Sequence, residues 1–192
     1  EAILIPTVLL YHRRGLRVHF LADWPMMLVP GVGYLYRRAQ VIPVFGKSAK
    51  PAFMNFFRPL FDQPGTAWER AAAKLQSGGS VGVFPEGTMN RDPKRLLRGR
   101  AGAARLAVEQ RVPVVPIGVR FPKHRGGEPI ADGEPMALKI GSALQPPAFE
   151  AASGKAPRDL VRAFQVRIME RLSTLSGKSW EPSAPRRRFD GS

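Results

Sequence analysis

The residues best suited to chemistry are a carboxylate, a glycine and a hydroxyl that follow one another after an apolar run. Residues 80–84 read SVGVF, and Pro85 ends this run before Glu86, Gly87 and Thr88. A continuous apolar run of this length is typical of a strand buried on both faces. Gly87 lets the backbone approach a ligand closely, and the Thr88 hydroxyl can donate a hydrogen bond. We therefore expect a loop that presents these groups to a ligand.

A strongly basic segment follows. Between residues 89 and 111 the acidic residues are Asp92 and Glu109, whereas the cationic residues are Arg91, Lys94, Arg95, Arg98, Arg100, Arg105 and Arg111. The planar fork of arginine suits the oxygens of a phosphate. The pattern therefore favours a phosphate-bearing ligand. The competing interpretation is a turn followed by a solvated basic face, because charge runs are usually only solvated.

Composition limits the classes of partner and chemistry. The 192 residues have the length of one ordinary domain, and a hydrophobic share of 44% argues against wholesale disorder. Lys and Arg number 30 against 15 Asp and Glu, and the resulting net charge of +15 requires an anionic partner. Nucleic acid, an acidic membrane surface and a phosphate-bearing substrate all qualify. The absence of cysteine excludes disulfides, thiolate metal sites and a cysteine nucleophile.

Helical and strand-like patterns alternate along the chain. The expected strands lie at 16–23, 41–45, 80–84, 112–121 and 136–144, and the expected helices at 1–15, 66–79, 99–110 and 157–177. This alternation predicts an α/β fold with a largely parallel central sheet flanked by helices. We expect one domain over residues 1–180 and a basic tail over residues 181–192. Ligands of such sheets bind beyond the carboxyl ends of the strands, where the loop after residue 84 is expected.

Two of the expected helices carry clear signals at their ends or on one face. Thr66 and Glu69 have the spacing of a capping box at a helix start. Pro157 suits the first turn of the last helix. The apolar face of that helix consists of Leu160, Phe164, Ile168, Leu172 and Leu175.

The residues FPEGT at 84–88 resemble the signature of the glycerolipid acyltransferases, the 1-acylglycerol-3-phosphate acyltransferase family. Three further blocks resemble that family in the expected order: HFLADWPMMLVPGVGYLYRRAQVIPV at 19–44, RLLRGRAGAARLAVEQRVPVVPIGV at 95–119 and IMERLSTLSGKSW at 168–180. Together they cover most of the chain. The family often has an arginine just after the first of these blocks, where this chain offers Lys47.

This resemblance implies an O-acyltransferase that moves an acyl group from acyl-CoA or acyl carrier protein to the hydroxyl of a lysophospholipid or glycerol phosphate acceptor in phospholipid synthesis. It implies no metal and no bound cofactor. In the family, the loop that matches Glu86, Gly87 and Thr88 holds the acceptor's phosphate, and an arginine commonly follows it. Here Met89 follows, so we expect Arg91 to take over that contact. The candidate acceptor-phosphate residues are Glu86, Gly87, Thr88, Arg91, Arg98 and Arg100.

Acyl transfer to a hydroxyl needs a base that accepts the hydroxyl's proton. In the family the base is a histidine, followed after four residues by an acid, at the start of a helix. His12, His19 and His124 have no acid at that spacing. Glu1 resembles the motif's acid, because the residues after it resemble those that follow the motif. We therefore expect the histidine five positions upstream of Glu1, before the first residue given, and a nearly inactive chain without it.

Two alternatives for the base stay open. One is a degenerate family member without a base, and the other is His19 acting with Asp23, four residues later. We interpret His19 as a strand histidine, His12 as a cation at a helix end and His124 as a loop residue.

Two rival classes are a nucleic-acid-binding protein and a lipid-surface binding module without catalysis. The net charge suggests the first, but neither a recognition helix nor an aromatic RNA-binding strand is recognisable, so we expect no specific nucleic-acid partner. Segments 51–61 and 24–28 gather Phe, Met, Trp and Leu beside Arg58. These side chains either belong to the core or suit a peripheral interface with anionic lipid. We expect a peripheral protein at the cytoplasmic face of the cell membrane.

Overall fold

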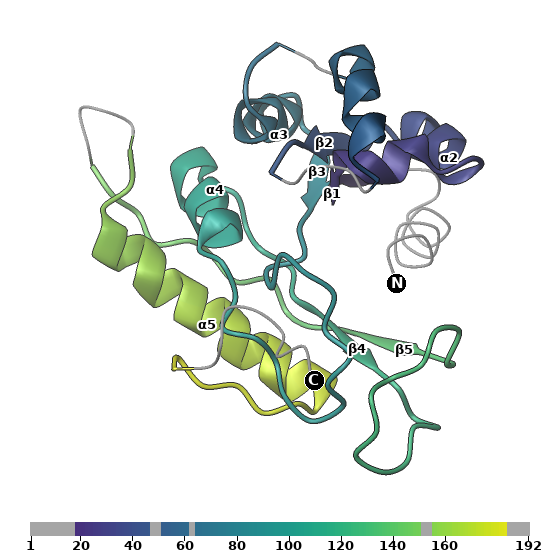
Figure 1. Cartoon of the computed structure of the whole chain (residues 1–192). Coiled ribbons are helices and arrows are strands. Elements are labelled where there is room, and N and C mark those ends of the chain that lie inside the picture. The colour runs from purple at the N-terminus through teal and green to yellow at the C-terminus, as the bar shows by residue number, and fades with distance from the viewer. Residues whose placement is uncertain (1–17, 47–50, 62–63, 151–154, 184–192) are drawn as a thin grey trace. The chain divides into compact units, whose positions relative to one another are not determined.

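The computed structural model describes residues 18–46, 51–61, 64–150 and 155–183 (Figure 1). The chain divides into two compact units, Glu1–Val83 and Phe84–Ser192. The expected helix at 1–15, with Glu1 and His12, lies outside the described residues, as do Lys47 and the tail from residue 184. The expectation of one domain over residues 1–180 stays a prediction.

The first unit contains a three-stranded parallel sheet. Its strands are β1 (Val18–Asp23), β2 (Ile42–Val44) and β3 (Ser80–Gly82), in the order β2-β1-β3. The helix α3 (Ala67–Gln76) packs against all three strands, as Figure 1 shows. The predicted α/β fold with a parallel sheet and flanking helices is thus confirmed. β3 is half-buried rather than fully buried, because within the described residues it pairs only with β1.

The start of α3 is fixed by the predicted capping box. The Thr66 hydroxyl accepts a hydrogen bond from the Glu69 amide at 3.2 Å, and the Glu69 carboxylate accepts one from the Thr66 amide at 2.7 Å. Two amides that lack helical partners are thereby satisfied. Arg70, on the same helix, donates to the carbonyl of Pro43 at 2.8 Å and so ties α3 to β2.

Short helical pieces join β1, β2 and α3 in the first unit. They are η1 (Trp24–Leu28), α2 (Val32–Arg38) and η2 (Ala52–Phe61). Trp24 is fully buried, with Phe45 stacked 6.1 Å from it between ring centroids. The large apolar side chains of η2 are mostly exposed, so only part of the two aromatic segments belongs to the core.

The second unit contains α4 (Gly102–Gln110), β4 (Ile117–Arg120), β5 (Ala137–Ile140) and α5 (Arg158–Ser176). β4 and β5 pair antiparallel, with Ile117 opposite Ile140, and α5 packs against α4 and both strands. The predicted apolar face of α5 supplies Phe164 and Ile168 to the core, together with Ala104, Ala107, Val108 and Val161.

β4 is shorter than the predicted strand at 112–121. Pro113 and Pro116 lack amide donors and therefore interrupt a strand ladder. Val114, between them, still exchanges two backbone hydrogen bonds with Leu144.

Candidate functional site

The candidate loop begins two residues after β3 in the sequence. The Gly87 amide donates to the Phe84 carbonyl at 3.0 Å, which closes a turn. Gly87 has a φ of 64°, in the left-handed region that favours glycine. The Thr88 side chain that follows is exposed. This backbone therefore presents Gly87 and Thr88 to solvent, as a ligand-binding loop requires.

Glu86 ties the turn to the basic segment behind it. One oxygen of its carboxylate accepts hydrogen bonds from the Leu97 amide at 2.8 Å and from the Asn90 side-chain amide at 2.7 Å. The same Asn90 nitrogen also donates to the Arg95 carbonyl at 2.9 Å. Glu86 therefore organises the loop through its carboxylate, a role that the sequence pattern did not reveal.

Asp92 organises the middle of this segment. Its carboxylate accepts from the amides of Lys94 at 2.7 Å and Arg95 at 2.9 Å, and its own amide donates to the Asn90 side chain at 3.0 Å. Aspartate and asparagine characteristically bond the backbone two residues on, so the sequence NRDP at 90–93 carried a readable turn signal.

Arg100 lies against Gly87. Its amide donates to the Pro85 carbonyl at 2.7 Å. A Cβ built on Gly87 would stand 2.7 Å from the Arg100 Nε, so any larger residue there would have to displace this side chain. The arginine is exposed. Of the predicted phosphate-binding residues, the structure thus brings Glu86, Gly87 and Arg100 together.

Arg91 and Arg98 are placed differently. The Arg91 guanidinium pairs with Asp132, at 2.7 and 2.8 Å from its two carboxylate oxygens, and the Arg91 carbonyl accepts from the Ile130 amide. The Arg98 carbonyl accepts from the Trp180 indole at 3.3 Å, which holds this backbone against the segment that follows the last helix, α5. That all six candidate residues line one phosphate pocket stays a prediction.

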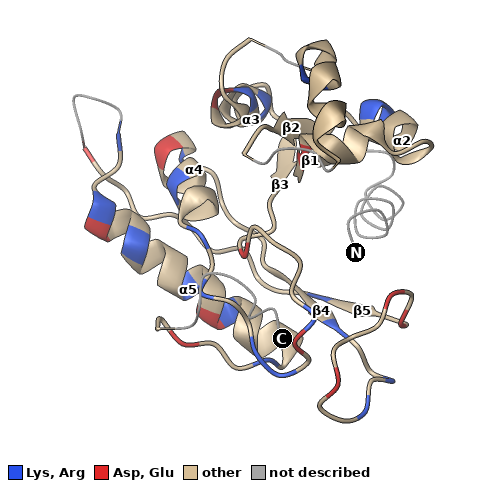
Figure 2. Cartoon of the chain, in the orientation of Figure 1, with Lys and Arg blue, Asp and Glu red and all other residues tan. Residues whose placement is uncertain are grey.

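The chain that leaves α5 supports the basic segment from behind. Ser179 accepts from the Leu96 amide at 2.9 Å and donates to the Lys94 carbonyl at 2.8 Å, in a short parallel bridge. The buried Lys178 donates to the Asp92 carbonyl at 2.7 Å. Figure 2 shows Lys and Arg along this segment and along α4 and α5. The basic segment is therefore anchored by residues remote from it in sequence.

His19 lies in β1, as expected of a strand histidine. It is buried, and its Nδ1 stands 3.1 Å from the Gln40 carbonyl. Along a strand, the Cα atoms of residues four apart are about 13 Å from each other at about 3.3 Å per residue, which argues against a working pair with Asp23. Burial raises the pKa of Tyr36 above its ordinary value, and the charge of Asp23 raises it further.

His124 contacts a carboxylate of its own loop. Its Nδ1 is 3.0 Å from both oxygens of Glu134. Two contacts lower the pKa of Glu134 below its ordinary value. The larger effect comes from the hydrogen bond that the Ala131 amide donates, and the smaller from the contact with His124. The sequence spacing did not reveal this pair, because the nine residues between His124 and Glu134 form an irregular loop. Within the described residues, no group of three or more His, Asp and Glu could hold a metal ion.

Comparison with known proteins identifies the family. A model of the acyltransferase family matches residues 3–120, more than half of the chain, including the 84–88 loop. Among solved structures, the 1-acyl-sn-glycerophosphate (LPA) acyltransferase PlsC from Thermotoga maritima aligns with a TM-score of 0.50 and 20% identity. The alignment covers 85% of this chain and 59% of the PlsC chain, and it supports the fold. No curated protein matches the sequence. By the family match the chain belongs to the acyltransferases, as the resemblance of its four blocks predicted.

Proposed function

We propose that the chain transfers an acyl group to the free hydroxyl of a lysophospholipid or glycerol phosphate whose phosphate binds at the 84–88 loop. The arrangement of Gly87 and Arg100 is the observation that carries this proposal. An exposed guanidinium lies beside a backbone turn that glycine leaves open, within a segment matched by the acyltransferase family. Acyl-CoA or acyl carrier protein is the proposed donor, and phospholipid synthesis the proposed process.

The proposed reaction forms an ester and breaks a thioester. The acceptor hydroxyl attacks the thioester carbonyl while a base accepts its proton, and the thiol leaves with a proton returned to it. The loop contributes by positioning the acceptor. When Arg100 and the backbone amides of the turn bind the acceptor's phosphate, the acceptor's hydroxyl, a few bonds away, is held near the thioester carbonyl. Glu1 stays the proposed acid partner of the base, and it lies outside the described residues.

The test separates acceptor binding from donor binding. Removing a charge-assisted hydrogen bond typically costs about 1.5–3 kcal/mol, or roughly 10- to 150-fold in affinity. Arg100→Ala should weaken binding of glycerol 3-phosphate or lysophosphatidate by at least about tenfold on this scale, and leave acyl-CoA binding unchanged. Arg91→Ala should likewise affect the acceptor much more than the donor. The matched control is Arg105→Ala, which removes an exposed arginine that pairs with Glu109 on α4.

Two results would contradict the proposal. Arg100→Ala could weaken donor and acceptor binding equally, which would assign the loop another role. Arg105→Ala could weaken acceptor binding as much as Arg100→Ala, which would show that the loss reflects the protein's overall charge rather than a specific contact. Calorimetric titration of each variant with each substrate measures both outcomes.

We also propose that η2 places the protein on the cytoplasmic face of a membrane as a peripheral protein. Phe53, Phe56 and Leu60 on this segment are 70%, 85% and 74% exposed. Beside them, Arg58 lies over the Phe45 ring, 5.4 Å from its centroid. Apolar insertion and attraction to anionic lipid add together at such a surface. None of the helices that the structure describes is long and apolar enough to span a bilayer.

Vesicle binding tests this surface. Phe56→Asp combined with Phe57→Asp should reduce binding to vesicles that contain anionic lipid, at unchanged salt, because insertion of apolar rings is lost. The control is Trp68→Asp, which changes an exposed aromatic residue of α3. Binding that depends on ionic strength alone would contradict insertion. Tight, sequence-selective DNA binding would favour the rival class instead.

A further inference from the structure

The His124 imidazole is held in one orientation by Glu134. The Glu134 carboxylate contacts His124 and also accepts a hydrogen bond from the Ala131 amide at 2.9 Å, so the carboxylate is itself held in place. The histidine side chain is 11% exposed. Because a carboxylate accepts hydrogen bonds, the Nδ1 carries the proton of this pair. The other ring nitrogen, Nε2, is therefore the atom left to meet another partner.

That second nitrogen has no partner in the described part of the chain. The His124 Nε2 is buried from solvent and makes no hydrogen bond. Native proteins leave few buried polar atoms unsatisfied, and such an atom calls for an explanation. This nitrogen is closed off from solvent, so His124 lines the neighbouring cavity through its other atoms.

His124 lines a pocket of about 310 Å³ within the second unit. This volume lies at the lower end of small-ligand sites, which hold about 300–1,000 Å³. As the structure describes it, the lining includes three basic residues, Lys94, Arg120 and Lys178, and no acidic residue. The pocket therefore favours a small anion. Its lining includes none of the six residues predicted to bind the acceptor phosphate.

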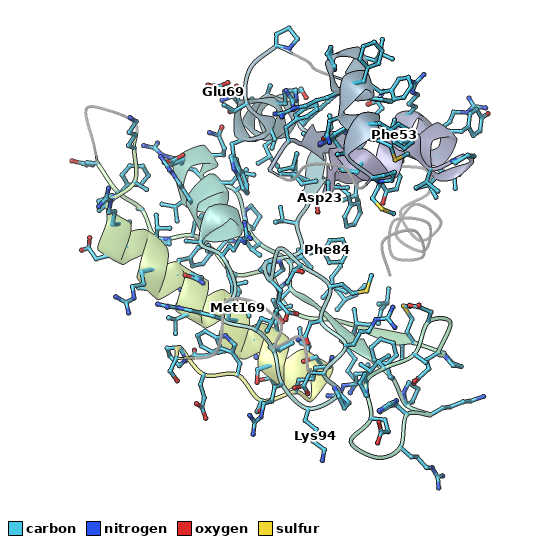
Figure 3. The ribbon with its side chains drawn as sticks, in the orientation of Figure 1. Asp23, Phe53, Glu69, Phe84, Lys94 and Met169 are labelled. Carbon is cyan, nitrogen blue, oxygen red and sulfur yellow. The ribbon has the colours of Figure 1, made fainter. Side chains whose placement is uncertain are left out.

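Two of these basic side chains donate to backbone carbonyls. Arg120 donates through Nε to the Leu175 carbonyl at 2.6 Å and through one terminal nitrogen to Thr174 at 3.2 Å. Its other terminal nitrogen makes no hydrogen bond within the described residues. Lys178 is bound to the Asp92 carbonyl. The Lys94 ammonium, labelled in Figure 3, stands 3.9 Å from where a Cβ on Gly127 would lie, beside the His124 loop.

We propose that this pocket is a second phosphate-binding site, in which Lys94 and Arg120 supply the charge and His124 forms part of the wall. The phosphate can belong to free phosphate, to the acceptor headgroup or to the nucleotide of a donor. All three share the chemistry that the pocket recognises.

Nuclear magnetic resonance of the histidine side chains tests the site directly. The chain has three histidines, so the His124 nitrogen signals are assigned by their loss in His124→Asn. That asparagine can still donate to Glu134 but has no counterpart of Nε2. Saturable shifts of the His124 signals with inorganic phosphate, with the His19 signals unmoved, are the expected result. They should persist in Arg100→Ala, which separates this site from the 84–88 loop.

Affinities give a second measurement that does not depend on the histidine variant folding. Lys94→Ala should weaken phosphate binding about tenfold, the loss of one charged hydrogen bond. Lys123→Ala, an exposed lysine next to His124 that does not line the pocket, should change it by less than about twofold because screening weakens distant charges.

Titrations with inorganic phosphate, glycerol 3-phosphate and a nucleoside 3′-phosphate identify the source of the phosphate. The probe that binds most tightly identifies the chemical class of the natural ligand, and equal affinity for all three probes indicates free phosphate. His124 signals that stay unmoved with all three probes would overturn the proposal. So would an equal loss of affinity in Lys94→Ala and Lys123→Ala.

Discussion

Replacing Glu86 by alanine should loosen the candidate loop before it alters any ligand contact. The carboxylate accepts two hydrogen bonds, at 2.7 and 2.8 Å, from Asn90 and from the amide of the buried Leu97. Hydrogen bonds to a charged group contribute about 1.5–3 kcal/mol each, and because Glu86 is half-buried we take the lower value. The two together predict a loss of about 3 kcal/mol in Glu86→Ala. Glu86→Gln keeps an acceptor and should lose about half of that.

Hydrogen exchange at the Leu97 amide measures this loss locally. About 3 kcal/mol corresponds to roughly 100-fold faster exchange in Glu86→Ala, since each 1.4 kcal/mol is a factor of ten. The control is Glu109→Ala, which breaks an exposed pair with Arg105 worth about 0.5 kcal/mol or less. Unchanged exchange at Leu97 together with abolished acceptor binding would refute the reasoning, because Glu86 would then act on the ligand itself.

Three further predictions concern stability. Gly87→Ala should lower the free energy of unfolding in urea by about 1–2 kcal/mol, because Gly87 has a positive φ and an added Cβ would meet Arg100. The loss should be smaller in an Arg100→Ala background, and an equal loss would exclude the contact with Arg100 as a cause. Thr66→Ala should cost about 1 kcal/mol through the lost cap and leave phosphate binding unchanged, so altered binding would contradict a purely local role. Because the pKa of Glu134 is lowered in the folded protein, its stabilising effect is present at neutral pH and is lost as acid protonates it. The melting difference between wild type and Glu134→Gln should therefore shrink on acidification below the carboxyl's ordinary value of 4.5, and a widening difference would refute the sign.

Local patterns predicted the elements well. The three parallel strands, the capping box of α3 and the apolar face of α5 were all read from residues within a few positions of one another. The errors also have local causes. β4 starts at Ile117 because the two prolines before it lack donors, and β3 is half-buried because it pairs on one side only among the described residues.

The interior of the site could not be predicted in the same way. The type and position of Glu86 marked it as functional, but its bond to the Leu97 amide depends on how the chain turns between them. The pair of Arg91 and Asp132 joins residues 41 apart in sequence, and neither residue signals the other. Long-range pairings of this kind leave no periodic pattern in a single sequence.

The bridge at Ser179 also means that the basic segment can complete its hydrogen bonds only late in synthesis of the chain. The hydrogen bonds that join residues 178–180 to residues 92–98 span 82 to 86 positions of sequence. At about 5–20 residues per second, a ribosome needs roughly 4 to 17 s to make the second partner after the first. Through that interval the amide of Leu96, a residue that is buried in the finished fold, lacks its Ser179 partner. The basic segment therefore leaves the ribosome with these backbone groups unpaired, and it depends on the residues that follow α5 to complete its hydrogen bonds.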